Sequence, residues 1–535
     1  VPLLYQSYRP AWAGREAELA YQLHSTPAQV WAELGGLGIG LGLMLLGWLG
    51  YWGIRLWRGL LPQALAGEAV SSIEYLTAST RRSQSTELEC DRIFTWSLLA
   101  GLGGYGIVAL TDYQLDIVCI SGTLIIYLAS LLSLLRQYAP SSSEQSTLKL
   151  APKSIKVVYW GLVGILLAVG LWLAPIHRAW QLSSQGFAAL AEEQFDAFRT
   201  DLEQAHRLAP WEPYYTYQLG WNLSQVSSDD AQVKQANAKQ SLEYFEHNVQ
   251  ASPNQESGTS SLGWQQLFNG QFPQAANSFL KSTRLMPAKG GVFYSLGQSL
   301  LLQNKKELGV KAIALEIVRD PLFLTSPLLQ TPQMAPIYPQ VQAEVVRLYQ
   351  QLLENRSEQD PLTPYLHQIL GGVYWWQGNL DAATAQWQQE GQPLGEAILA
   401  IAKNKAISTD VPILKAWLEP QQRTQWIEKA LLQANQSPPN PQEVQAIQTG
   451  MDRSQSFDQW VKQNAPVRQS PRVRAGFGVL SRHIDGPAPA DFFPVVENAV
   501  VAEFLPGLFP SPFYSPALDT ALQPFRERLW RSISL

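Results

Sequence analysis

The sequence has few cysteines and few charged residues. Its 535 residues include two cysteines, Cys90 and Cys119, and neither lies in the long polar half of the chain after Pro175. A disulfide framework is therefore excluded for that half. Charged residues make up 16% of the chain and the formal net charge is −5. Because no basic face is evident, the composition argues against nucleic acid as a partner.

Four runs of about 20 residues carry no charge at all, namely 34–54, 93–111, 117–135 and 157–176. A helix of that length crosses a hydrocarbon core of about 30 Å. A backbone inside a bilayer must satisfy its own polar groups, which favours helices. Tryptophan and tyrosine gather near the ends of the runs, as at membrane interfaces. The alternative is a set of buried core helices, but four such runs in one third of a chain favour four transmembrane helices over residues 34–176.

The distribution of basic residues predicts how these spans are oriented across the membrane. The loop after the first span has five arginines, and the loop after the third has Arg136 and three lysines. The turn TDYQLD between the second and third spans has two aspartates and no basic residue. The positive-inside rule places the two basic loops in the cytoplasm. We therefore expect a multi-pass protein of the plasma (inner) membrane, with residues 1–33 and everything after residue 176 on the extracytoplasmic side.

A periodic helical pattern follows. Its glycines are 34, 43 and 34 residues apart, at Gly186, Gly220, Gly263 and Gly297. A 34-residue period is typical of tetratricopeptide repeats. The best copy is 262–287, in which small residues allow two helices to approach closely and Phe279 fills the gap between them. A degenerate copy contains Gly371 and Trp387. The 43-residue step indicates an insertion of nine residues, around 227–240.

These patterns predict an all-α protein. Polytopic transmembrane helices are followed by an α-solenoid of tetratricopeptide-like repeats over residues 177–435. Residues 436–535 are rich in Pro, Gly and Phe, and they either cap the last repeat or have no assigned fold. Repeat arrays offer extended concave surfaces, so we expect a docking face for a protein, a glycan or a lipid-linked chain rather than a spacer. The aromatic stretch 211–221 is either a sugar-stacking surface or, as we favour, inter-repeat core.

His24 lies just before the first predicted span. Ser25 or Thr26 can cap a helix and Pro27 suits its first turn. We therefore predict a helix that begins at about Pro27 and runs without interruption into the first span. Its N-terminus would carry partial positive charge and free N–H groups, which suit a phosphate.

Arg9 and Arg15 lie just upstream of this histidine, and Glu33 follows it. Arginine matches diphosphate oxygens through its forked donors and permanent charge. A histidine in such a cluster could take a proton from an incoming hydroxyl. The alternative is that His24 and the arginines are polar residues of the membrane interface.

The stretch HSTPAQVWAELGGLGIG, residues 24–40, resembles the histidine motif of the O-antigen ligase-like family, which includes O-antigen ligases and O-antigen polymerases. The matching residues are His24, Ser25, Glu33, Gly35 and Gly38. Residues 106–132 are similar to the family's late hairpin, in which an acidic turn joins two helices. Several members also carry a tetratricopeptide tail outside the membrane.

This resemblance implies a membrane glycosyltransferase. It would move a glycan from a polyprenyl-diphosphate carrier to an acceptor hydroxyl, with inversion of the sugar carbon and without a metal or other cofactor. His24 would act as the catalytic base or position the acceptor, and Arg15 and Arg9 would bind the diphosphate, with Glu33 close by. Members have more spans than this sequence, so residues 1–176 would correspond to the late part of a larger membrane domain.

Three functions follow as expectations. The first is the C-terminal part of such a glycosyltransferase, whose partners are a polyprenyl-diphosphate-linked glycan, membrane lipid and a protein bound to the repeats. The second is a membrane-anchored tetratricopeptide scaffold that recruits a protein without catalysis. The third is bicarbonate or small-solute transport. Transport is the weakest, because transporter spans carry polar or acidic residues and these four have almost none.

Overall fold

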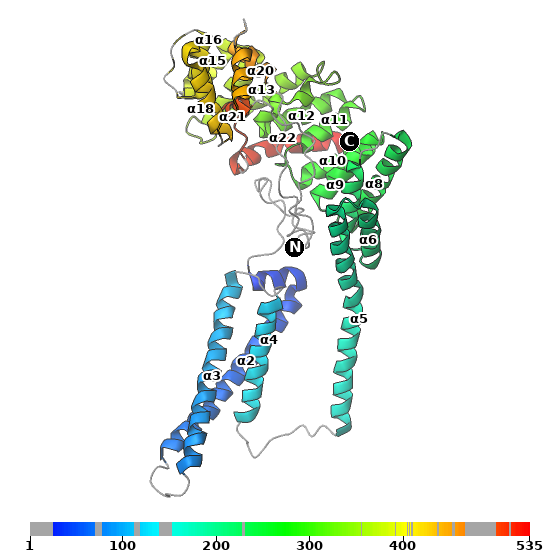
Figure 1. The fold of residues 1–535 in the computed structure, drawn as a ribbon, viewed down its shortest axis with the longest axis vertical. Helices are drawn as coiled ribbons and strands as arrows, with labels where there is room; N and C mark the ends of the chain where they lie inside the picture. Colours follow the sequence, from blue (N-terminus) through cyan, green and yellow to red (C-terminus); the bar gives the residue numbers. More distant parts are fainter. Residues whose placement is uncertain are drawn as a thin grey trace. The chain divides into compact units, whose positions relative to one another are not determined.

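The computed structural model describes residues 25–69, 78–111, 118–138, 152–226, 230–354, 356–390, 392–403, 405, 407, 410–435, 438–451, 455–465, 499–512 and 515–534. Every regular element in these ranges is a helix, which confirms the predicted all-α class (Figure 1). The chain forms two compact units, and the described residues divide between them at Ala174 and Pro175.

The first unit contains long apolar helices: α2 (Thr26–Ala69), α3 (Ala78–Thr111), α4 (Val118–Tyr138) and most of α5 (Pro152–Ala191). Helix α2 packs against α3 and α4, and α3 packs against α4. Within the described residues, one segment, Ile93–Leu110 of α3, is long and apolar enough to cross a membrane. Gly35–Trp48 and Cys119–Leu134 are shorter apolar stretches. All four predicted spans therefore stay predictions.

Helix α2 begins where the sequence predicted and then breaks. The Ser25 Oγ accepts a hydrogen bond from the Ala28 N–H at 3.4 Å, so Ser25 caps the helix. Gly35, however, has φ +61° and ψ −154°, which interrupts the helix. The prediction of an uninterrupted helix from Pro27 into the first span is therefore wrong. A Cβ at Gly35 would meet no atom within 4 Å, so the positive φ, and not crowding, favours glycine here.

The second unit is a succession of helices in which most neighbours along the chain pack against each other. After the end of α5 it contains α6 (Phe195–Leu208), α7 (Pro213–Gln225), α8 (Ala231–Ala251), α9 (Glu256–Phe268), α10 (Phe272–Leu285), α11 (Val292–Leu301), α12 (Lys306–Arg319), α13 (Tyr338–Glu354), α14 (Thr363–Gln377), α15 (Leu380–Glu390), α16 (Pro393–Ala402), α17 (Pro412–Leu418), α18 (Arg423–Asn435), α19 (Pro441–Met451), α20 (Phe457–Gln463), α21 (Ala499–Leu508) and α22 (Pro516–Ser534).

A glycine and a large side chain sixteen residues later bring successive helices close together. A Cβ at Gly263 in α9 would lie 2.7 Å from the Phe279 ring of α10. The same relation joins Gly297 to Ile313, Gly186 to Leu202 and Gly371 to Trp387. The close approach predicted at Phe279 is confirmed, and the degenerate copy at Trp387 makes the same contact. The pattern works because only a residue without a side chain leaves room for the partner.

The α7–α8 pair carries the expected insertion. Here the glycine and its partner, Gly220 and Phe245, are 25 residues apart and still in contact, with a Cβ at Gly220 placed 3.0 Å from the ring. Helix α8 has 21 residues, whereas α10 has 14. Seven of the additional residues therefore lengthen α8 before Phe245, which agrees with the predicted position.

The aromatic stretch of 211–221 lies mainly inside this unit. Tyr214, Tyr215 and Tyr217 are each at most 3% exposed, whereas Trp211 is 55% exposed. Tyr214 lies against Phe187 and Tyr217 against Phe245, with ring centroids 5.7 Å apart in both pairs. The three tyrosines therefore belong to the core of the second unit.

The C-terminal helices return to earlier parts of the second unit. Helix α21 packs against α14, α16 and α18, and α22 packs against α12. The Trp530 Nε1–H of α22 donates to the Thr283 Oγ1 of α10 at 3.0 Å. Helix α22 therefore packs against helices in the middle of the succession, α10 and α12, rather than at its end.

Candidate functional site

The side chains of the predicted catalytic cluster lie outside the part of the chain that the structure describes. His24, Arg9 and Arg15 lie outside the described residues. Glu33 belongs to α2, but its side chain is also outside what the structure describes. The catalytic and diphosphate-binding assignments therefore stay predictions.

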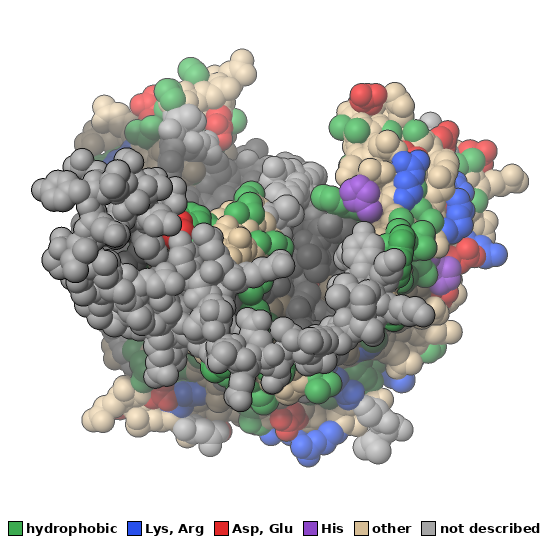
Figure 2. All heavy atoms as spheres, turned by 90° about the horizontal axis from the view of Figure 1, so that it is seen from below, with side chains coloured by type: hydrophobic (Ala, Val, Ile, Leu, Met, Phe, Trp, Pro, Cys, Tyr) green, Lys and Arg blue, Asp and Glu red, His purple; other side chains and the backbone are tan. Residues whose placement is uncertain are grey.

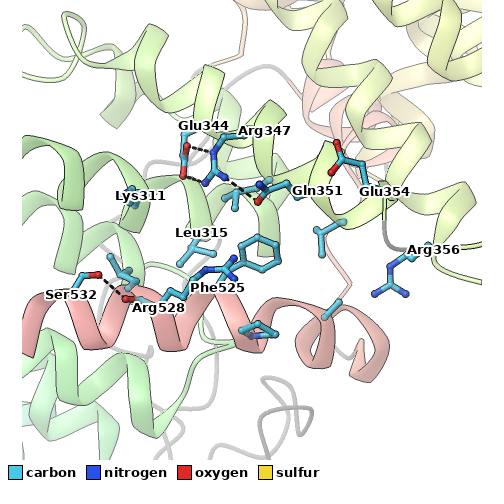
Figure 3. A pocket seen from close by; sticks show the side chains of 15 residues that line it. Lys311, Leu315, Glu344, Arg347, Gln351, Glu354, Arg356, Phe525, Arg528 and Ser532 are labelled. Atoms are coloured by element: carbon cyan, nitrogen blue, oxygen red, sulfur yellow. Dashed lines mark hydrogen bonds and ion pairs between the residues drawn. The ribbon is translucent and has the colours of Figure 1, made fainter.

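A groove in the second unit is a candidate site in the described part of the chain. Its volume is about 840 Å³, and it lies between α12, α13 and α22 (Figure 3). Four leucines form its floor, and each of them is at most 4% exposed. They are Leu315 from α12, Leu348 and Leu352 from α13, and Leu529 from α22. Pro524 and Phe525 of α22 add apolar surface that is less buried.

Cations outnumber anions around this floor. The lining contains Lys311, Arg347, Arg356 and Arg528 against two carboxylates, Glu344 and Glu354. Four positive and two negative charges give the lining a net charge of +2, although the whole chain has −5. The groove is therefore a positive region on an acidic protein, which favours an anionic ligand.

Two of these arginines already have carboxylate partners. Arg347 donates to Glu344 from Nε at 2.7 Å and from Nη2 at 2.5 Å, and its Nη1 donates to the Gln351 Oε1 at 2.9 Å. Its hydrogen bonds to Glu344 raise the pKa of Arg347, and the negative charge of Glu344 adds to the effect. Arg356 pairs with Asp360 at 2.5 Å. These two cations shape the groove wall and offer less charge to a ligand.

Lys311 and Arg528 are the cations left for a ligand. Within the described residues neither has a carboxylate at ion-pair distance, and both are exposed. The Arg528 guanidinium lies 4.6 Å from the centroid of the Phe525 ring, which holds it over the groove side of α22 by a cation–π contact. They come from different helices, α12 and α22, and both line the groove (Figure 3).

The groove lining combines apolar side chains with charged groups that can bind a ligand. It has no histidine or cysteine, and the Ser532 hydroxyl donates to the Arg528 backbone oxygen at 2.8 Å. Over the residues that the structure describes, no group of three His, Cys, Asp or Glu side chains is placed to hold a metal ion.

A histidine pair elsewhere is a weaker candidate. Figure 2 shows histidine side chains exposed on the face seen from below. His206 of α6 and His247 of α8 stack with ring centroids 6.0 Å apart. Burial lowers the pKa of His206, and the charges of His247 and Arg207 lower it further. Stacked rings do not direct two nitrogens at one ion, so the pair carries no metal site.

Sequence analysis did not find the groove residues. Lys311, Arg347 and Arg528 belong to three segments that are far apart in the chain. Their only local signal is a cation one helical turn from a buried leucine, as in Lys311 and Leu315. That signal is common on amphipathic helices and does not indicate which helices meet.

No protein-family model matches the chain, and no curated protein matches it at a level that indicates common descent.

Proposed function

We propose that this chain is a membrane-anchored scaffold that recruits a polypeptide partner without catalysis. Residues 34–176 anchor it, residues 177–435 form a tetratricopeptide-like array, and that array lies on the extracytoplasmic side. The observation that carries the proposal is the groove between α12, α13 and α22, which combines a leucine floor with two cations that have no ion-pair partner among the described residues. Such a lining suits recognition of a side-chain-bearing ligand.

Two further features support the scaffold. The sixteen-residue relation between a glycine and a large side chain recurs at Gly186, Gly263, Gly297 and Gly371, as in stacked two-helix repeats. The segment Ile93–Leu110 is apolar and only 17% buried, and Ile93 and Ile107 are 67% and 71% exposed. Apolar side chains exposed in this way are suited to lipid contact.

A photo-crosslinking experiment tests recruitment. A photoreactive amino acid replaces Glu354, an exposed residue at the groove, in the full-length protein in its native cells. We expect it to form a discrete adduct with a protein upon irradiation. The matched control replaces Glu246, an exposed glutamate of α8 that does not line the groove, and should give no such adduct. No adduct from Glu354, or the same adducts from both positions, contradicts the scaffold.

Glycan transfer is the second candidate function, and the start of a helix directly after His24 supports it. Ser25 caps α2 directly after His24, and Gly35 breaks α2 with a positive φ ten residues later. We propose that His24 accepts the proton of the acceptor hydroxyl, while Arg9 and Arg15 bind the diphosphate and Glu33 contributes to substrate binding. On this proposal the chain acts together with further membrane spans as an O-antigen ligase or polymerase, with a polyprenyl-diphosphate-linked glycan as donor.

His24→Ala distinguishes the two candidates. For the transferase, we expect surface glycan transfer by the cells to fall to background, because a positioned base typically contributes about 10²–10⁴-fold. For the scaffold, glycan transfer and the Glu354 adduct both stay at the wild-type level. His177→Ala serves as the control, since His177 is an exposed histidine of α5 outside the motif. Equal effects of the two variants on glycan transfer would count against a catalytic role for His24.

A further inference from the structure

We infer that the groove between α12, α13 and α22 binds a short acidic, amphipathic polypeptide segment. Carboxylates of this segment contact Lys311 and Arg528, and its apolar side chains cover Pro524 and Phe525. The inference rests on the proposed docking function and specifies the chemistry of the partner.

Charge complementarity favours an acidic partner. When Asp360, the partner of Arg356, is counted with the lining, four cations face three carboxylates, so the groove has a net charge of +1 on a chain of −5 and attracts an acidic segment. Glu344 is already neutralised by its two hydrogen bonds from Arg347. Lys311 and Arg528, on the α12 and α22 walls, are then the groups that can pair with ligand carboxylates (Figure 3). A basic segment would meet both of them with like charge.

The size and apolar lining of the groove favour a short segment with apolar side chains. A volume of about 840 Å³ accommodates a few side chains and not the face of a folded domain. The floor leucines are at most 4% exposed, whereas Pro524 and Phe525 are more exposed, so burial of the apolar surface of Pro524 and Phe525 would add to the ion pairs. An acidic segment with apolar residues three or four positions apart presents both properties on one helical face.

The same lining argues against a glycan and against a lipid surface. Sugar stacking needs an open aromatic face, but Phe525, the only aromatic residue of the lining, has the Arg528 guanidinium over its ring. Attraction to anionic lipid typically uses clusters of four to eight basic residues. Here two cations remain after Arg347 and Arg356 pair with their carboxylates.

A peptide-display selection tests the inference. A library of random 12-residue peptides is selected on the full-length protein in detergent and depleted on the Lys311→Glu/Arg528→Glu variant. We expect the enriched peptides to be net negative, with apolar residues three or four apart. Their dissociation constants should rise about tenfold in that variant and about threefold in Lys311→Gln/Arg528→Gln, since two partly exposed ion pairs are lost.

The matched control is Lys306→Glu/Arg531→Glu. It makes the same charge change on the same two helices, at exposed residues that do not line the groove, and it should leave binding within twofold. Enrichment of basic or neutral peptides, or no enrichment, overturns the inference. So does competition by anionic phospholipid vesicles or by an acidic oligosaccharide at concentrations where an acidic peptide does not compete.

The outcomes separate this inference from the docking function. If the Glu354 position captures a protein but the selected peptides are not acidic, docking stands and the acidic partner is wrong. If acidic peptides bind the groove in the selection but Glu354 captures nothing in cells, the scaffold function fails.

Discussion

Asp519→Asn is expected to destabilise the second unit by about 3–5 kcal/mol, because it removes the carboxylate that two buried guanidinium groups share. Asp519 is completely buried, with its Oδ1 at 3.0 Å from the Arg319 Nε and at 2.7 Å from the Arg526 Nη2. Arg319 and Arg526 are 3% and 1% exposed. Burial lowers the pKa of Arg526, and Asp519 opposes that change. An amide supplies hydrogen bonding but no negative charge.

Thermal unfolding and hydrogen exchange of the full-length protein in detergent measure this effect. We expect amides of α22 and of the α12 segment beside it to lose protection first, since Asp519 joins these two helices. Asp458→Asn is a matched control, because its ion pair with Lys462 is 28–29% exposed and such pairs contribute about 0–1 kcal/mol. Replacing all three buried groups by apolar residues (Arg319→Met, Asp519→Leu, Arg526→Met) should recover part of the lost stability. Equal unfolding temperatures for Asp519→Asn and wild type would refute the role of this cluster.

Trp387→Ala is expected to cost about 3–5 kcal/mol, the usual range for removing a fully buried aromatic side chain. Trp387 of α15 is 0% exposed, and its Nε1–H donates to the Gln368 backbone oxygen of α14 at 3.0 Å. Its indole fills the space that both Gly371 and Gly395 leave open by having no side chain. The variant therefore creates a cavity between α14, α15 and α16 and removes the hydrogen bond to the Gln368 backbone oxygen.

A double-variant cycle tests the glycine–tryptophan contact itself. Gly371→Ala should destabilise by about 1–3 kcal/mol through overpacking against the indole. Combined with Trp387→Ala, the same substitution should cost much less, because the clash is gone and the new methyl group occupies part of the cavity. Trp211→Ala, at a residue that is 55% exposed, should change stability by less than about 1 kcal/mol. Strict additivity of the two substitutions would show that Gly371 and Trp387 do not form one packing unit.

The sequence predicts the start of α2 correctly, but it does not predict the break inside that helix. Ser25 caps α2 as expected, since an N-cap needs only a side-chain oxygen beside a helix start. The break at Gly35 was not predicted, because glycine is tolerated inside helices as well as at positive φ. The predicted site of His24, Arg9, Arg15 and Glu33 stays a prediction, whereas the groove was not predicted at all.

The sequence by itself determined the all-α class, the glycine positions at which helices approach closely and the place of the nine-residue insertion. These features are readable because helix periodicity and the absence of a side chain act over one or two turns. Only the tertiary structure decided that Arg319 pairs with Asp519, two hundred residues later, and that Lys311 and Arg528 lie along one groove. Such contacts depend on which helix faces meet. A helix with an apolar stripe could bury that stripe equally well against several other helices. Packing of the whole unit determines which helix faces meet, and no local sequence pattern predicts that packing.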